Sequence, residues 1–114
     1  MASFSHLHVH TQYSILDGAS NISHLIERVK SFGMEAVAIT DHGNMFGVKE
    51  FHAAALKKGI KPVIGCEIYV AKRSIAEMTG KEDRSGDHLI LLAKNLTGYK
   101  NLIKLVSTAW IKGF

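Results

Sequence analysis

Segments with the pattern of buried strands alternate along this chain with segments of helical periodicity. The short apolar runs rich in β-branched residues occupy 5–10, 36–40, 62–64 with 67–70, and 88–93. Apolar residues at helical spacing follow the first, second and fourth of these runs. Such alternation is typical of a parallel sheet covered by helices, which is either open or closed into a barrel. The sequence therefore predicts an α/β fold.

Three helices are predicted from apolar periodicity of 3.6 residues. Their buried stripes are Ile22, Leu25, Ile26, Val29 and Phe32; Val48, Phe51, Ala55 and Leu56; and Leu102, Ile103, Val106, Ala109 and Trp110. Gly33 and Gly59 come just after the first two stripes, where glycine commonly ends a helix. Thr97 is predicted to cap the third helix. The polar segment 72–87 has no periodicity and is predicted to be a loop.

The composition suits one small globular domain. The chain has 114 residues, 46% hydrophobic and 21% charged, and it contains no apolar stretch long enough to span a membrane. Without signal-peptide features we expect a cytoplasmic protein. The single cysteine, Cys66, is expected to be a small buried hydrophobe. The net charge of +4, with Lys72, Arg73, Lys81 and Arg84 near one another, permits an anionic substrate without requiring one, and we expect a solvated loop there.

A histidine pair near the N-terminus provides the first chemical signal. In the run His6-Leu7-His8-Val9-His10, alternate side chains of a strand project from the same side, so His8 and His10 would lie about 7 Å apart on one face. Neutral imidazole is the commonest transition-metal ligand in proteins. The spacing therefore indicates a metal site, although chance occurrences of this pattern are common and further ligands are needed.

Further candidate ligands follow other predicted strands. His42 comes just after the second strand and Glu67 lies in the third, while Asp17 and His88 are additional candidates and Asp41 is adjacent to His42. Singly, each has an ordinary structural role, such as a turn cap or a lysine partner. The βα loops of a parallel α/β fold share one face, so these groups would meet beside the histidine pair. Their repulsion and desolvation would cost several kcal/mol unless cations neutralised them.

The predicted ligands are nitrogen and oxygen atoms without thiolates, which suits Zn, Mn or Fe. A carboxylate such as Glu67 can bridge two ions, and paired ions are used to hydrolyse phosphate esters. We therefore predict phosphoester hydrolysis, with a metal-activated hydroxide near Asp41 and no side chain assigned as catalytic. His24 and His52 lie on predicted helices away from this face and are expected to be solvated or packing residues.

Four segments resemble the start of the PHP (polymerase and histidinol phosphatase) domain, and most closely the branch at the N-terminus of bacterial DNA polymerase III alpha subunits. These segments are 6–18, 39–47, 59–67 and 88–95. The resemblance implies a distorted, seven-stranded TIM-like βα barrel that binds up to three divalent ions, Zn or Mn. It places six residues at ligand positions: His8, His10, Asp17, His42, Glu67 and His88.

The resemblance also implies a place in a larger protein. Residues 1–114 would be the N-terminal part of a PHP domain, with about four of its seven βα units, and the palm that carries polymerase catalysis would lie elsewhere. The family implies metal-dependent 3′ to 5′ exonuclease activity, and as partners DNA, the proofreading exonuclease and the sliding clamp. A partial barrel exposes a sheet edge and apolar surface, so self-association is expected.

Three other interpretations remain open at this stage. The PHP domain can act as a scaffold of the polymerase, in which case bound metal would stabilise it without turnover. A stand-alone PHP phosphatase would act on a small phosphomonoester. An amidohydrolase also begins with His-x-His on its first strand, although Glu67 on the third strand fits the PHP pattern better.

Overall fold

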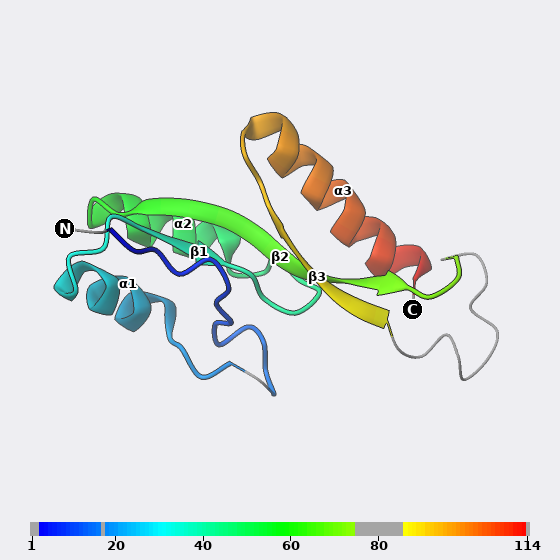
Figure 1. Cartoon of the computed structure of the whole chain (residues 1–114), viewed down its shortest axis with the longest axis horizontal. Helices are drawn as coiled ribbons and strands as arrows, with labels where there is room; N and C mark the ends of the chain where they lie inside the picture. Colours follow the sequence, from blue (N-terminus) through cyan, green and yellow to red (C-terminus); the bar gives the residue numbers. More distant parts are fainter. Residues whose placement is uncertain (1–2, 17, 75–85, 114) are drawn as a thin grey trace.

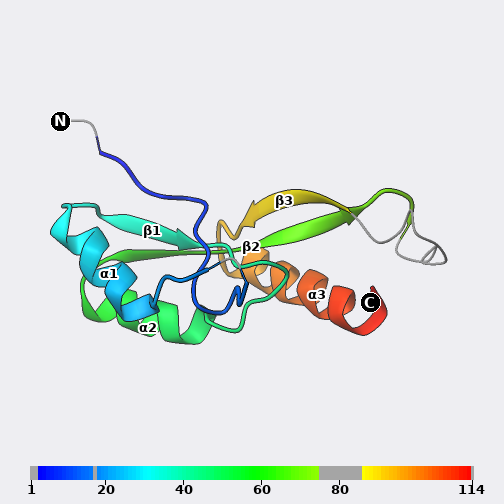
Figure 2. The ribbon, with the colours of Figure 1, turned by 90° about the horizontal axis from the view of Figure 1, so that it is seen from below.

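The computed structural model describes residues 3–16, 18–74 and 86–113, and Figure 1 follows them along the chain. The elements are helix α1 (Ile22–Ser31), strand β1 (Ala36–Ile39), helix α2 (Val48–Lys57), strand β2 (Lys61–Ala71), strand β3 (Gly86–Leu92) and helix α3 (Leu96–Lys112). The strands form one sheet in the order β1-β2-β3. In Figure 2 the three helices lie on the same side of this sheet. The fold is therefore mixed α/β, as predicted.

Strands β1 and β2 and the helices α1 and α2 form the main core. The two strands pair in parallel from Ala36–Lys61 to Ile39–Ile64, and α2 supplies the crossover that a parallel pair requires. The buried core residues of this unit are Ile22, Ile26, Val29, Val37, Ile39, Val48, Phe51, Ala55 and Ile60. Nearly all of them belong to the predicted apolar stripes and strands. Phe32 and Leu56 were predicted to be buried, but they are exposed at the ends of their helices.

Helix α3 packs on the sheet through only part of its apolar surface. Leu102 and Val106 contact Cys66 of β2, whereas Trp110 is 47% exposed. Ile103 and Ala109 are exposed too, so the predicted buried stripe is wrong at three positions. The buried residues of α3 are Leu102 and Val106, which pack around Cys66, so the rest of the predicted stripe stays on the surface. Among the described helices, none combines the length and apolar character needed to cross a bilayer.

The first turn of α3 begins before the predicted cap. The side chain of Asn95 accepts a hydrogen bond from Gly98 N at 2.9 Å, so Asn95 is the N-cap and Thr97 lies inside the helix. Asparagine and threonine are both common N-cap residues, and periodicity alone does not distinguish positions two residues apart. The prediction of Thr97 as the cap is therefore wrong.

Residues 5–10 do not form the predicted regular strand. They run beside β1, where Ala38 N donates to His6 O at 2.9 Å and Thr40 N donates to Val9 O at 2.8 Å. Val9 N, however, donates to the Thr40 side chain at 2.8 Å. A side-chain oxygen thus replaces a backbone carbonyl, and the segment is extended without a strand ladder.

Strand β3 pairs with β2 in antiparallel fashion, which departs from the predicted all-parallel sheet. The paired residues run from Gly65–Leu92 to Ala71–Gly86. β2 continues through Gly65 as a single strand to Ala71, and β3 runs back beside it. Leu89 is 44% exposed, so β3 is not the predicted buried strand.

The predicted loop 72–87 is described only in part. Residues 75–85, which include Lys81 and Arg84, lie outside the described residues. Lys72 and Arg73 are described and are exposed.

Candidate metal centre

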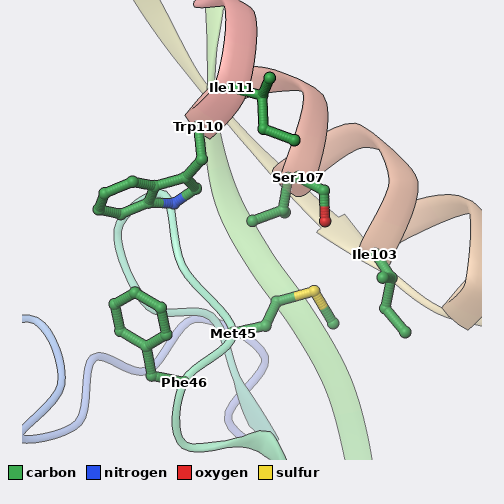
Figure 3. Close-up of a pocket in the computed structure, with 7 residues that line it drawn as sticks. Met45, Phe46, Ile103, Ser107, Trp110 and Ile111 are labelled. Carbon is green, nitrogen blue, oxygen red and sulfur yellow. The ribbon is translucent and has the colours of Figure 1, made fainter. Parts of the chain in front are cut away.

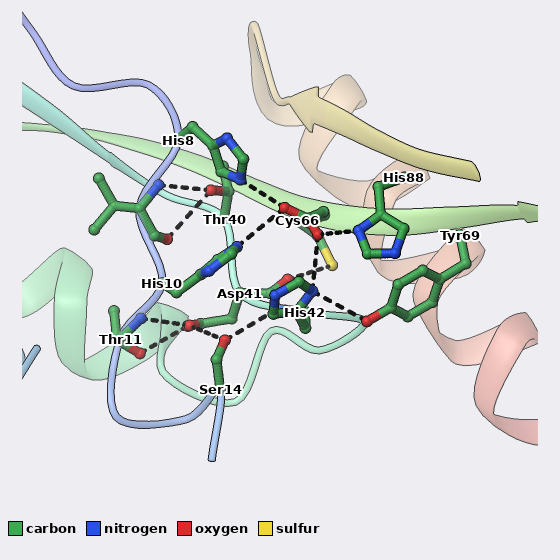
Figure 4. A network of polar contacts seen from close by, with 12 residues as sticks. His8, His10, Thr11, Ser14, Thr40, Asp41, His42, Cys66, Tyr69 and His88 are labelled. Carbon is green, nitrogen blue, oxygen red and sulfur yellow. Dashed lines mark hydrogen bonds and ion pairs between the residues drawn. The ribbon is translucent and has the colours of Figure 1, made fainter. Parts of the chain in front are cut away.

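Glu67 of β2 is the centre of a histidine cluster. Its side chain is buried, with the residue 2% exposed. Oε1 lies 2.6 Å from His8 Nε2 and 3.0 Å from His10 Nε2. Oε2 lies 2.8 Å from His42 Nδ1 and 2.7 Å from His88 Nδ1. Each carboxylate oxygen therefore faces two imidazole nitrogens. Figure 4 labels the four histidines and draws their contacts as dashed lines.

The four histidines reach this point from three segments. His8 and His10 lie on the extended N-terminal segment beside β1. His42 follows β1 and makes an isolated parallel bridge with Glu67. His88 lies on β3, opposite Tyr69 of β2. The sheet register brings them together, because β2 is the central strand and each neighbouring segment contributes imidazoles to its Glu67 side.

Asp41 holds the segment that carries His10. The Asp41 residue is 1% exposed, and its Oδ1 accepts from Thr11 N at 2.6 Å and from Ser14 Oγ at 2.7 Å. Its Oδ2 accepts from Thr11 Oγ1 at 2.8 Å, and Ser14 Oγ in turn accepts from His42 N at 3.1 Å. Both carboxylate oxygens are engaged in this buried network, so Asp41 is a structural neighbour of the histidine cluster.

The electrostatic state of Glu67 follows from its neighbours. Burial alone would raise the pKa of the Glu67 carboxyl, but hydrogen bonds from three imidazoles and the charge of the fourth outweigh burial. The pKa falls to about 2, so Glu67 is a carboxylate throughout the neutral range. All four imidazole nitrogens thus lie within 3.0 Å of this carboxylate.

The cluster divides into two ligand groups that share Glu67. His8, His10 and Glu67 form the first, and His42, Glu67 and His88 form the second; within each group the ligand atoms lie within 4.8 Å of one another. Imidazole nitrogen and carboxylate oxygen are suitable donors for Zn²⁺ or Mn²⁺. The side chains of His8 and His88 are 57% and 56% exposed, so each group is open to solvent on one side. The donor atoms of each group therefore suit a divalent cation.

Asp17 falls outside the described residues. His24 and His52 are exposed on α1 and α2, as expected. The ring of His6 packs edge-on against Phe4, and His6 belongs to neither ligand group.

Cys66 is a buried neutral thiol, as predicted. Its Sγ lies 3.4 Å from the carbonyl oxygens of Asp41 and Asn44, and the residue is 0% exposed. Burial is the main cause that raises the pKa of the Cys66 thiol to about 11. The side chain thus packs in the second core with Leu102 and Val106, on the opposite side of β2 from Glu67.

Sequence reasoning did not single out Tyr69, Thr11, Ser14 or Thr40. Tyr69 Oη lies 3.1 Å from His42 Nδ1. A signal for Tyr69 was present, because residues two apart on a strand share a face and Tyr69 follows Glu67 by two. For the hydroxyl residues no comparable signal exists, since their partners are about thirty residues away along the chain.

An open apolar pocket of about 340 Å³ lies between α3 and the loop after β1, apart from the ligand groups. Figure 3 shows Met45, Phe46 and Trp110 around it. The rings of Phe46 and Trp110 are 5.7 Å apart at their centroids, and Trp110 Nε1 donates to Gly43 O at 2.8 Å. No lining residue of this pocket is a histidine, cysteine or acid, so it offers no metal ligand set.

Known proteins resemble the chain in sequence. Residues 6–114 match the family model of the PHP domain. DNA polymerase III subunit alpha of Borreliella burgdorferi is 53% identical over 114 residues, which are 97% of this chain and 10% of that protein. The subunit alpha of Treponema pallidum is 53% identical over 112 residues, again 97% of this chain and 10% of that protein. The chain thus spans about a tenth of the length of these relatives.

Two solved structures share the fold. An amidohydrolase from Chromobacterium violaceum superposes with a TM-score of 0.61 and 25% identity, covering 91% of this chain and 34% of that one. A Bifidobacterium adolescentis protein, assigned as a metal-dependent phosphoesterase, gives a TM-score of 0.61 at 20% identity, covering 90% and 33%. The second match is evidence for the fold alone. With the family-model match over nearly its whole length, the chain belongs to the PHP domain family.

Proposed function

We propose that this chain is the metal-binding PHP module of a DNA polymerase III alpha subunit and that it supports hydrolysis of phosphodiesters of the 3′ to 5′ exonuclease type. The observation that carries the proposal is Glu67, whose two oxygens each face a separate pair of imidazoles. The names of the relatives support the polymerase context. The partial PHP barrel, cytoplasmic location and replication partners inferred from the resemblance belong to this proposal.

The proposed ligands are His8, His10, Asp17, His42, Glu67 and His88. When bound, divalent cations would supply Lewis acidity and would activate water for attack on phosphorus. Glu67 contributes a fixed negative charge at the shared position. His10 and His42 are the more enclosed imidazoles, with side chains 19% exposed. Each provides the less solvent-exposed imidazole ligand of its group. Asp41 holds the backbone on which both of these residues lie. Zn and Mn are the proposed ions.

Elemental analysis of the purified chain tests the metal site. We expect bound Zn or Mn in the unmodified protein, loss of part of it in His10→Ala, and loss of most of it in Glu67→Gln, because only Glu67 belongs to both groups. His24→Ala is the matched control, since His24 is exposed on α1. Metal content that is the same in all four proteins would refute the site.

A nuclease assay tests the reaction separately. The substrate is a single-stranded oligonucleotide labelled so that removal of the 3′ nucleotide is visible, incubated with Mn²⁺. We expect nucleotide release that Glu67→Gln abolishes and His24→Ala retains. Stoichiometric bound metal together with no nucleotide release by any of these proteins would contradict the exonuclease function and favour the scaffold function.

The scaffold function has a specific observation in its favour. Large apolar side chains are exposed beside the pocket of α3, including Phe46 at 64%, Trp110 at 47% and Ile111 at 80%. Exposed apolar patches commonly mark protein interfaces. This surface also supports the predicted self-association, which light scattering at several concentrations measures. A concentration-independent monomer mass would contradict self-association.

A further inference from the structure

Tyr69 points its hydroxyl into the second ligand group. It follows Glu67 by two residues on β2, so both side chains leave the same face of the strand. Tyr69 Oη lies 3.1 Å from His42 Nδ1, the same nitrogen that lies 2.8 Å from Glu67 Oε2. Partners that merely orient a metal-binding histidine usually contact the nitrogen that faces away from the ion. The phenol contacts the inward nitrogen, so it belongs inside the group.

The ring of Tyr69 is held by packing that does not involve its hydroxyl. It lies nearly parallel to the His42 ring, at 7° and 6.2 Å between centroids, and edge-on to the His88 ring at 4.8 Å. Gly43 has a φ of +61°, and a Cβ there would lie 3.3 Å from Tyr69 Cε2. Trp110 fixes this turn by donating to Gly43 O. The hydroxyl is therefore presented at a defined place by its surroundings.

We propose that Tyr69 binds substrate phosphate by donating its phenolic hydrogen to a phosphoryl oxygen held at the second ligand group. The inference rests on the proposed function, because it needs a cation in that group. Tyr69 is 51% exposed, and the contact of its hydroxyl with His42 is itself exposed to solvent. A phosphate has several oxygens, so one can bind the cation while another accepts from the phenol. A neutral donor fits this task because it adds no repulsion toward the cation.

Phosphate affinity measured by calorimetry tests this role. The chain is loaded with Mn²⁺, inorganic phosphate is titrated, and the dissociation constant is compared with that of Tyr69→Phe. We expect the constant to rise about 5- to 20-fold, as for loss of a hydrogen bond to a charged group at a half-exposed site. Tyr13→Phe is the matched control, because it removes the same atom where Tyr13 Oη contacts Glu50 instead.

The outcomes separate this inference from the proposed function. Equal phosphate affinity of Tyr69→Phe and unmodified protein overturns the inference, and so does Mn²⁺ loss in Tyr69→Phe, which would make Tyr69 a positioning residue of the metal site. Mn²⁺ binding by the unmodified chain without phosphate binding also overturns it. Absence of Mn²⁺ binding in the unmodified chain contradicts the proposed function itself. Weaker phosphate binding in Tyr69→Phe alone, at unchanged Mn²⁺ content, supports the inference.

Discussion

Replacement of Asp41 by alanine should destabilise the metal-free protein strongly. Asp41 accepts three hydrogen bonds in the buried network, from Thr11 N, Thr11 Oγ1 and Ser14 Oγ. Alanine removes every acceptor at once and leaves these donors in an interior where the residue is 1% exposed. Hydrogen bonds to a charged group contribute about 1.5–3 kcal/mol each. The three are not additive, because water can enter the space and the hydroxyls can rotate.

We therefore expect the free energy of unfolding to fall by about 3–5 kcal/mol in Asp41→Ala, because three buried neutral donors lose their acceptor at about 1–3 kcal/mol each and entering water recovers part of that loss. Asp41→Asn should lose less, about 1–2 kcal/mol, since its amide oxygen still accepts two bonds and the Thr11 hydroxyl can reverse to accept the third. The assay is urea unfolding followed by far-ultraviolet circular dichroism, with a chelator present to remove any contribution of metal. Asp87→Ala on exposed β3 is the control. A loss below about 1 kcal/mol in Asp41→Ala would refute the reasoning.

Three more predictions follow from single residues. Asn95→Ala should cost about 1 kcal/mol in urea unfolding because Gly98 N loses its cap, whereas Thr97→Ala should cost less. The pKa of Glu67 is lowered to about 2, so its ionised form stabilises the folded state at pH values above the usual carboxyl pKa. In chelator, the free energy of unfolding should therefore fall as pH falls from about 4.5 through 2. A free energy of unfolding that stays constant over this pH range would contradict the prediction. Cys66, with its pKa raised to about 11, should react with iodoacetamide far more slowly than the unfolded chain at pH 8, as mass spectrometry can follow.

Periodicity predicted the parts of the fold in which one face of an element meets the core. Ile22, Ile26 and Val29 are spaced for one side of α1, and all three are buried there. The same reasoning fails at Phe32, which extends the stripe past the last contact with the core and instead packs its ring under Arg28. A stripe shows which side of a helix faces inward, but the length of that contact depends on the neighbouring elements.

The direction of β3 could not be predicted because nothing in the local pattern reports the length of β2. A glycine at position 65 suggests that the strand is interrupted there, yet β2 continues through it. The absence of a side chain at Gly65 leaves room for the neighbouring strand. A Cβ at Gly65 would lie 2.5 Å from Leu91 O, so glycine allows β3 to approach. Glycine inside a strand often marks such a close backbone approach. An uninterrupted β2 then leaves an antiparallel return as the short route to its edge.

The candidate site was easier to anticipate than the elements that carry it. His8, His10, His42, Glu67 and His88 were selected for their chemistry, and the structure brings these five together. Their role as metal ligands stays a prediction, as does that of Asp17. The N-terminal segment nevertheless lacks the regular strand that was expected to present its histidines. Its extended conformation is enough to keep two alternate side chains on one side.

The two ligand groups differ in how the backbone segments that carry them are held. Glu67 lies on the central strand, which pairs with β1 on one edge and β3 on the other. The first group depends on a segment without a strand ladder, which two backbone bonds beside β1 and side-chain bonds of Thr40 and Asp41 hold in place. In the second group, His88 belongs to a paired strand and His42 forms a bridge with β2. Because a paired strand carries a backbone ladder that the N-terminal segment lacks, the second group is the more firmly anchored of the two.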